Sequence, residues 1–183
     1  MLLLGRSTIR RNWFVDAAKS PNARYAAIHR FDPGLRMVRN GLFESTDPQR
    51  FEGAVSTLLF LLGFASTVQL EKDSPDIVAM TPLGSIILVE CTTRVSDVFA
   101  KVGKLVDRRG MLAVSLKDAS IYGDVSAVLV CRSPLAQIAG QDDIKNAGVL
   151  LVTKEGLEEG LRRALLPASP DQLLEEAKGS LST

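Results

Sequence analysis

The sequence predicts an α/β fold in which a central mixed sheet is flanked by helices on both faces. Three observations support this prediction. From residue 64 onward, short apolar runs typical of strands alternate with longer stretches of helical period. The run 125–131 is almost wholly apolar, as in a strand buried on both faces. A Pro and a Gly within residues 81–85 predict a turn between antiparallel neighbours, so the sheet is mixed.

Size and composition fit one domain of ordinary size. Of the 183 residues, 46% are hydrophobic and 23% are charged, which is typical of a globular protein with a substantial core. We expect three parts. Residues 1–46 form an N-terminal extension, residues 47–166 form the α/β core, and residues 167–183 form a C-terminal tail with one short helix over 171–178.

The N-terminal extension is predicted to contain a β-hairpin. Between residues 23 and 43, two mixed apolar and basic runs flank Asp32-Pro33-Gly34. Proline fixes φ at one position of a turn, and glycine accepts a positive φ at the next. The tripeptide therefore predicts a turn that joins two strands.

The core begins with a predicted helix over residues 47–63. Asp47 suits the N-cap, Pro48 suits the first helical position, and Gly63 ends the helix. Apolar residues follow at helical spacing and trace one face: Phe51, Val55, Leu58, Leu59 and Leu62.

Strands and helices alternate after this first helix. The predicted elements are a strand over 64–70, two strands within 74–92, a helix from residue 96, a strand over 125–131, a helix over 134–147, a strand over 148–153 and a helix over 154–166. Gly103 and Gly110 weaken the helix that starts at residue 96, and they indicate a close approach or a break.

The two strands within residues 74–92 each place one carboxylate on an apolar face. Asp76 shares a face with Val78, and Glu90 shares a face with Leu88, because side chains alternate along a strand. Removing a carboxylate from water costs on the order of several kcal/mol unless a cation or good donors compensate it. We therefore expect a cation where the two carboxylates lie side by side, and hard oxygen ligands suit Mg²⁺ or Mn²⁺.

These residues resemble a known motif. Pro75-Asp76, followed by Glu90-Cys91-Thr92 at the end of an apolar strand, is similar to the signature of the PD-(D/E)XK nuclease superfamily, whose fold is called restriction-endonuclease-like. The resemblance includes Phe51-Glu52 in the first core helix and the later alternation of strands and helices, so it spans about residues 47–166. It implies metal-dependent hydrolysis of phosphodiester bonds, with Asp76 and Glu90 as catalytic metal ligands.

The chain departs from the family pattern at one position. Where the pattern has a lysine two residues after the Glu, this chain has Thr92. Some members take the lysine from the following helix, and Lys101 and Lys104 lie three residues apart on one face of the predicted helix. We therefore expect Lys101 or Lys104 to be catalytic, unless the site is inactive. The main-chain carbonyl of Cys91 could add a metal ligand, and the resemblance adds the carboxylate of Glu52.

Three functions are compatible with these residues. The first is a Mg²⁺- or Mn²⁺-dependent endonuclease, a cytoplasmic hydrolase that acts on DNA and for which the resemblance allows a homodimer. The second is a catalytically inactive nuclease-like domain that binds nucleic acid or protein. The third, a general α/β domain that binds a small molecule, lacks any nucleotide-binding motif. Residues 1–50 hold nine Lys and Arg against four Asp and Glu, which suits a phosphate partner, although the same arginines could simply be solvated.

Other classes of site lack the residues they need. His29 is the single histidine and falls in the predicted hairpin, which leaves a Ser-His-Asp triad without an organiser. Cys91 and Cys131 lie in apolar strand runs, so we expect buried, reduced thiols. The longest apolar run, 55–68, is shorter than the roughly twenty residues that a membrane span needs, and we expect no membrane partner.

Overall fold

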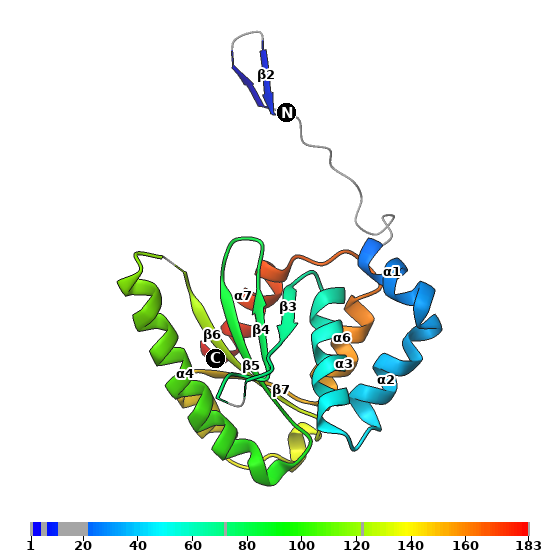
Figure 1. The fold of residues 1–183 in the computed structure, drawn as a ribbon, viewed down its shortest axis with the longest axis vertical. Coiled ribbons are helices and arrows are strands. Elements are labelled where there is room, and N and C mark those ends of the chain that lie inside the picture. The colour runs from blue at the N-terminus through cyan, green and yellow to red at the C-terminus, as the bar shows by residue number, and fades with distance from the viewer. Residues whose placement is uncertain (1, 5–6, 11–21, 72, 122, 183) are drawn as a thin grey trace.

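The computed structural model describes residues 2–4, 7–10, 22–71, 73–121 and 123–182, and its fold is α/β (Figure 1). A five-stranded sheet has the order β3-β4-β5-β6-β7. Its strands are β3 (Ala65–Val68), β4 (Ile77–Met80), β5 (Ile86–Thr92), β6 (Val125–Cys131) and β7 (Val149–Val152). β4 pairs antiparallel with both β3 and β5, whereas β5, β6 and β7 are parallel, which confirms the predicted mixed sheet.

Helices cover both faces of this sheet. The α-helices are α1 (Ala23–Phe31), α2 (Arg36–Phe43), α3 (Pro48–Leu61), α4 (Val98–Asp118), α5 (Gln141–Asn146), α6 (Lys154–Arg163) and α7 (Pro170–Ser182). Short 3-10 helices cover Pro33–Leu35, Val95–Asp97 and Leu135–Gln137. A separate antiparallel pair is formed by β1 (Leu2–Leu4) and β2 (Ser7–Arg10).

The core consists of two apolar layers, one on each face of the sheet. Ile87, Val89 and Cys91 of β5 face the layer built with α2, α3, α6 and α7. Leu88 faces the opposite layer, where α4 and α5 pack. This alternation is the period-two pattern expected of a buried strand. It decides on which side of the sheet each polar residue of β5 lies.

The helix that begins the core forms as predicted. The Asp47 carboxylate accepts a hydrogen bond from the backbone N–H of Gln49, and Pro48 is the first residue of α3. Phe51, Val55 and Leu58 are buried against the sheet. The chain leaves the helix at Gly63, whose φ of +102° is readily accessible only to glycine.

The predicted β-hairpin over residues 23–43 is wrong, because this range forms α1 and α2. The side chain of Asn22 caps α1 by accepting from the backbone N–H groups of Arg24 and Tyr25. Asp32 accepts from the first N–H groups of α2. A turn tripeptide does not specify which elements it joins, and the buried Val38 and Leu42 at helical spacing decide for a helix.

Two further helix predictions need correction. The range 134–147 is not one helix, because the chain passes through Gly140 at a φ of +64° before α5 begins. A side chain at residue 140 would collide with the ring of Phe99. In contrast, Gly103 and Gly110 neither break α4 nor mark a close approach, since no described atom beyond the adjoining helix backbone lies within 4 Å of a Cβ built at either position.

Candidate active site

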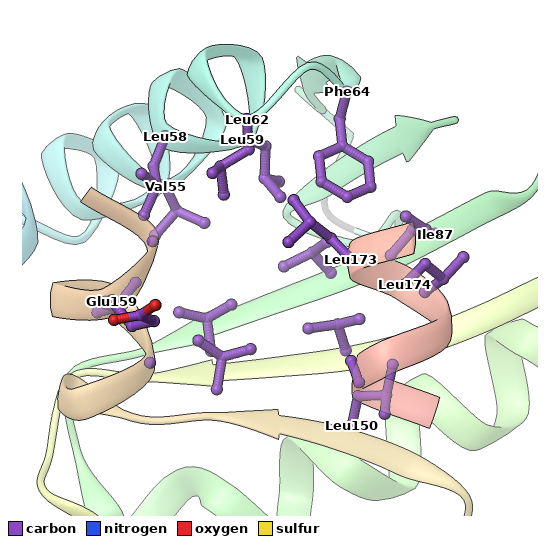
Figure 2. Close-up of a pocket in the computed structure, with 18 of the residues that line it drawn as sticks. Val55, Leu58, Leu59, Leu62, Phe64, Ile87, Leu150, Glu159, Leu173 and Leu174 are labelled. Carbon is purple, nitrogen blue, oxygen red and sulfur yellow. The ribbon is translucent and has the colours of Figure 1, made fainter. Parts of the chain in front are cut away.

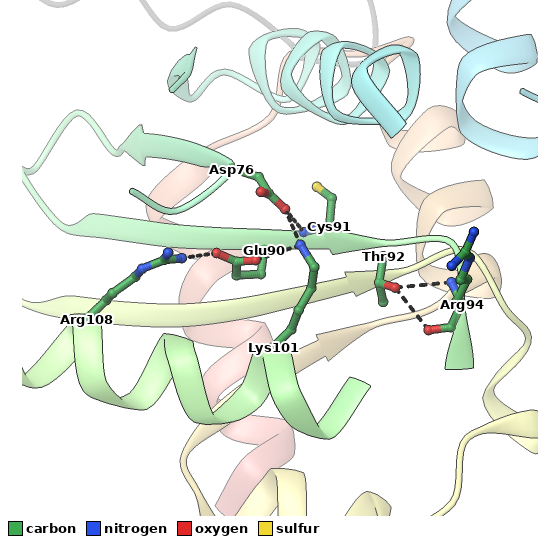
Figure 3. Close-up of polar contacts among 7 residues, drawn as sticks. All are labelled: Asp76, Glu90, Cys91, Thr92, Arg94, Lys101 and Arg108. Atoms are coloured by element: carbon green, nitrogen blue, oxygen red, sulfur yellow. Dashed lines mark hydrogen bonds and ion pairs between the residues drawn. The ribbon is translucent and has the colours of Figure 1, made fainter. Parts of the chain in front are cut away.

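The pairing of β4 with β5 brings the two predicted carboxylates together. Ile77 lies opposite Val89 in the antiparallel ladder, so the residues one step further, Asp76 and Glu90, are neighbours. The backbone N–H of Cys91 donates to Asp76 Oδ2 at 2.7 Å, which holds the aspartate against β5. Figure 3 shows the two carboxylates near each other at β5, with Lys101 reaching toward them from α4.

Lys101 of α4 lies between these carboxylates. Its Nζ is 2.8 Å from Asp76 Oδ2 and 2.7 Å from Glu90 Oε2. The Glu90 side chain is only 3% exposed, whereas Lys101 remains 23% exposed. The structure therefore brings together three of the predicted site residues, and it supplies a positive charge from the helix that follows the strand.

Lys104 does not belong to this cluster. It is exposed on α4, and within the described part of the chain no hydrogen bond or ion pair joins it to Asp76 or Glu90. Residues three apart on a helix lie on the same side of it, but their side chains point in directions that differ by about 60°. Of the two lysines that the sequence offered, the geometry selects Lys101.

Arg108 is a site residue that the sequence interpretation did not include. Its guanidinium donates to Glu90 Oε1, while Lys101 binds the other oxygen of the same carboxylate (Figure 3). Lys101 and Arg108 lie seven residues apart, which is about two helical turns, so both point toward β5. The i, i+7 spacing of two cations on one helix was the signal that could have revealed it.

Thr92 has a local structural role. Its hydroxyl donates to the carbonyl of Arg94 and accepts from the backbone N–H of the same residue. The side chain is buried, so it stabilises the turn from β5 into the next helix. Because threonine is neutral, the positive charge next to the carboxylates comes from α4.

The charges in the cluster shift the pKa values of the groups around it. Burial alone would lower the pKa of Lys101, but its hydrogen bonds to Asp76 and Glu90 outweigh that effect and raise the pKa. Lys101 is therefore protonated at neutral pH. Burial and the negative charge of Asp76 raise the pKa of Glu52 and, more strongly, that of the Cys91 thiol. A thiol of this kind is a poor nucleophile.

A polar hollow opens beside the cluster. It has a volume of about 490 Å³ and lies where β5 ends, between the starts of α3 and α4. Its walls include Glu52, Lys101, Arg94 and Arg132, the last of which is held by a hydrogen bond to the carbonyl of Ser45. Glu52 thus lies within electrostatic range of the carboxylates, although no hydrogen bond joins it to them in the described structure.

The donor set fits a hard divalent cation in part. The oxygens of Asp76 and Glu90 lie close enough to share one ammonium group, and Mg²⁺ commonly binds through one or two carboxylates together with water and phosphate oxygens. Among the described residues, no group of three or more His, Cys, Asp and Glu side chains is arranged to hold a metal. A metal would therefore be bound by these two carboxylates together with main-chain carbonyls, water or phosphate oxygens.

The side chains of His29, Cys91 and Cys131 do not contribute to the site, to which Cys91 adds only backbone groups. His29 is exposed on α1, where its ring stacks on Tyr25. Cys91 and Cys131 are buried free thiols, as predicted, and they face opposite core layers. None of the described helices combines the length and the apolar composition that crossing a bilayer requires.

Comparison of the chain with protein-family models gives no match, and comparison with curated protein sequences gives none either. The cluster formed by Asp76, Glu90, Lys101 and Arg108 is the feature of the molecule that indicates a function.

Proposed function

We propose that the chain is a divalent-metal-dependent nuclease with a restriction-endonuclease-like fold, which hydrolyses phosphodiester bonds in DNA. The observation that carries this proposal is the meeting of Asp76, which immediately precedes β4, and Glu90 of β5 at the ammonium group of Lys101. Two carboxylates and a lysine are the residue types of the motif that the sequence resembles. Here the lysine comes from α4, in place of Thr92.

The order of the elements supports the same proposal. The sequence predicted a helix, a strand, two carboxylate strands, a helix that carries the lysine, and a further strand. These correspond to α3, β3, β4, β5, α4 and β6 in the structure. The two predicted carboxylate strands are adjacent, so their charges lie at one site.

Asp76 and Glu90 would hold the metal, with the main-chain carbonyl of Cys91 as a further ligand. A divalent ion bound there would activate water and neutralise charge on the scissile phosphate. Arg108 holds Glu90 Oε1 and so orients the other carboxylate oxygen toward the cation position.

Lys101 would act as an electrostatic stabiliser. Because its hydrogen bonds to Asp76 and Glu90 raise its pKa, the ammonium group keeps its proton at neutral pH and cannot serve as a general base. A fixed positive charge beside the reacting phosphate stabilises the negative charge that develops during hydrolysis. The Lys101 side chain is partly exposed and lines the polar hollow.

The polar hollow would receive the nucleic-acid backbone. Arg94 is exposed at its wall, and Arg132 contributes a second guanidinium. Arginine binds phosphate oxygens through paired N–H donors. These two residues would position the substrate strand next to Lys101 without reading its sequence.

The test is cleavage of plasmid, linear and single-stranded DNA, with RNA in parallel, in Mg²⁺ or Mn²⁺. We expect Glu90→Gln and Lys101→Met to lose at least about 100-fold in rate, the scale of removing one electrostatic group from an active site. Lys104→Met is the matched control on the same helix and should retain wild-type activity. Equal cleavage by wild type and Glu90→Gln would contradict the proposal.

A second candidate is a catalytically inactive nuclease-like domain that binds nucleic acid or protein. The observation that favours it is that Lys101 and Arg108 already neutralise both carboxylates. This candidate predicts binding of DNA without cleavage and no change of melting temperature with Mg²⁺ or Mn²⁺. The nuclease predicts a higher melting temperature with the metal, because a ligand that binds only the folded state stabilises it.

A further inference from the structure

An apolar cavity lies on the side of the sheet opposite the carboxylates. Its volume is about 230 Å³, and it is partly open to solvent and bounded by α3, α6, α7 and strands β5, β6 and β7 (Figure 2). Val55 and Leu59 of α3 point into it from one side, and Leu173 of α7 lines it from another. Packed interiors leave few spaces larger than a water molecule, so an apolar space of this size between helices and sheet is unusual.

The walls make the cavity unsuitable for water. Almost all of the lining consists of branched aliphatic side chains, together with Phe64. Among the described residues around it, the charged ones are Glu159 and Arg163, which lie on α6 at its margin. A buried water needs two or more polar partners, and an apolar cavity of about 150 Å³ is known to stay dry and to bind benzene. A larger cavity of the same character therefore offers space for an apolar molecule.

The charged groups at the margin are already paired with one another. Arg163 Nε lies 2.9 Å from Glu159 Oε1, and its Nη1 lies 2.6 Å from Glu176 Oε2 on α7. The guanidinium is thus shared by two carboxylates. An ionised group that entered the cavity would lose its hydration among aliphatic side chains that offer it no hydrogen bond.

We propose that the cavity between α3, α6, α7 and the sheet is a binding site for a small uncharged hydrocarbon-like molecule, aromatic or branched aliphatic. This site is separate from the carboxylate cluster, because the alternation along β5 directs Val89 into the cavity and Glu90 to the opposite face. The proposal does not depend on nuclease activity. Burial of apolar ligand surface supplies its affinity.

The test uses the full chain with benzene, toluene and benzoate as probes. We expect benzene and toluene to raise the melting temperature by roughly 3 °C near saturation of the site. The same probes should shift the methyl resonances of Leu58, Leu59 and Val89 in NMR spectra. Benzoate matches toluene in shape but carries a negative charge, so it should produce neither effect.

Two variants fill the cavity from different helices, and a third variant, outside the cavity, serves as the control. Leu59→Phe on α3 and Ala177→Leu on α7 should abolish the thermal shift, and either one suffices if the other does not fold. Gln172→Leu adds the same side chain at an exposed position of α7 and should keep the wild-type response. A lack of any response to benzene and toluene, or equal shifts in folded filled variants and wild type, would overturn the proposal.

Discussion

At the scale of single residues, the site consists of two carboxylates that form ion pairs with two cations. Glu90 is buried and binds Lys101 through one oxygen and Arg108 through the other. Asp76 Oδ2 accepts hydrogen bonds from Lys101 Nζ and from the backbone N–H of Cys91. A buried carboxylate without such partners would be costly, so the cations stabilise the fold as well as shaping the site.

Replacing Lys101 by Met should destabilise the protein by up to about 3 kcal/mol, because it leaves Glu90 with one cation and Asp76 with none. The loss should be lower than for a fully buried pair, since Lys101 is partly exposed. Urea denaturation at pH 7 measures it. Lys104→Met removes the same charge from an exposed position, and we expect its free energy of unfolding to stay within about 0.5 kcal/mol of wild type. Equal losses in the two variants would show that the ion pairs add nothing.

Glu52 predicts a dependence of stability on pH. Burial and the charge of Asp76 raise its pKa in the folded state. The folded protein therefore binds this proton more tightly than the unfolded chain does, and the stabilising contribution of protonated Glu52 is lost as pH rises through the folded pKa. We expect Glu52→Gln to be more stable than wild type at pH 7 and to lose that advantage near pH 4. Melting temperatures at the two pH values, without divalent metal, test this; an advantage that grows at pH 4 would contradict it.

At the scale of elements, the end of α3 is fixed by a close approach. Gly63 has a φ of +102°, and a Cβ at this position would lie 2.9 Å from Pro170 Cγ and 3.3 Å from the carbonyl oxygen of Ala168. The start of α7 therefore packs directly on the turn that leads into β3. At Gly53, in the middle of α3, an added Cβ would meet no described atom within 4 Å apart from the adjoining helix backbone.

Replacing these two glycines by alanine should change the free energy of unfolding in opposite directions. Gly63→Ala combines a strained backbone with a collision, and we expect a loss of at least about 1 kcal/mol. Gly53→Ala restores helix propensity and should stabilise α3 by roughly 0.5 to 1 kcal/mol. Guanidinium denaturation of the two variants gives both values. A neutral Gly63→Ala would mean that the turn and the start of α7 adjust freely.

At the scale of the whole molecule, Asn22 joins three helices. Its side-chain oxygen caps α1, and its Nδ2 donates to the carbonyls of Leu61 at 2.9 Å and Ala164 at 2.8 Å. These carbonyls end α3 and α6, which are distant in the sequence. The side chain thereby anchors α1 to the α/β core from a buried position.

Asn22→Ala should destabilise the protein by roughly 2 to 3 kcal/mol, because it removes a helix cap and leaves two carbonyls without their donor. Thermal unfolding followed by circular dichroism measures this loss. Asn40→Ala is a suitable control, since Asn40 makes an exposed hydrogen bond to Glu44 and should cost well under 1 kcal/mol. Similar losses in the two variants would contradict the anchoring role.

Much of the core could be predicted because its signals are local. The N-cap at Asp47, the apolar run of β6 and the turn over residues 81–85 each specify an element within a few residues. The failure over residues 23–43 has a physical reason. The turn at Asp32 is compatible with strands or helices, and the burial of α2 against α3 was not visible in a short window.

The sequence by itself determined the order of the core elements and the face on which Asp76 and Glu90 lie, since both follow from backbone periodicity. Only the tertiary structure decided that Lys101 rather than Lys104 meets them, that Arg108 completes the cluster, and that an apolar cavity remains behind β5. These features depend on how far α4 lies from β5 and how closely α7 packs on the opposite face. Such distances result from the packing of segments far apart in the chain, which no local pattern records.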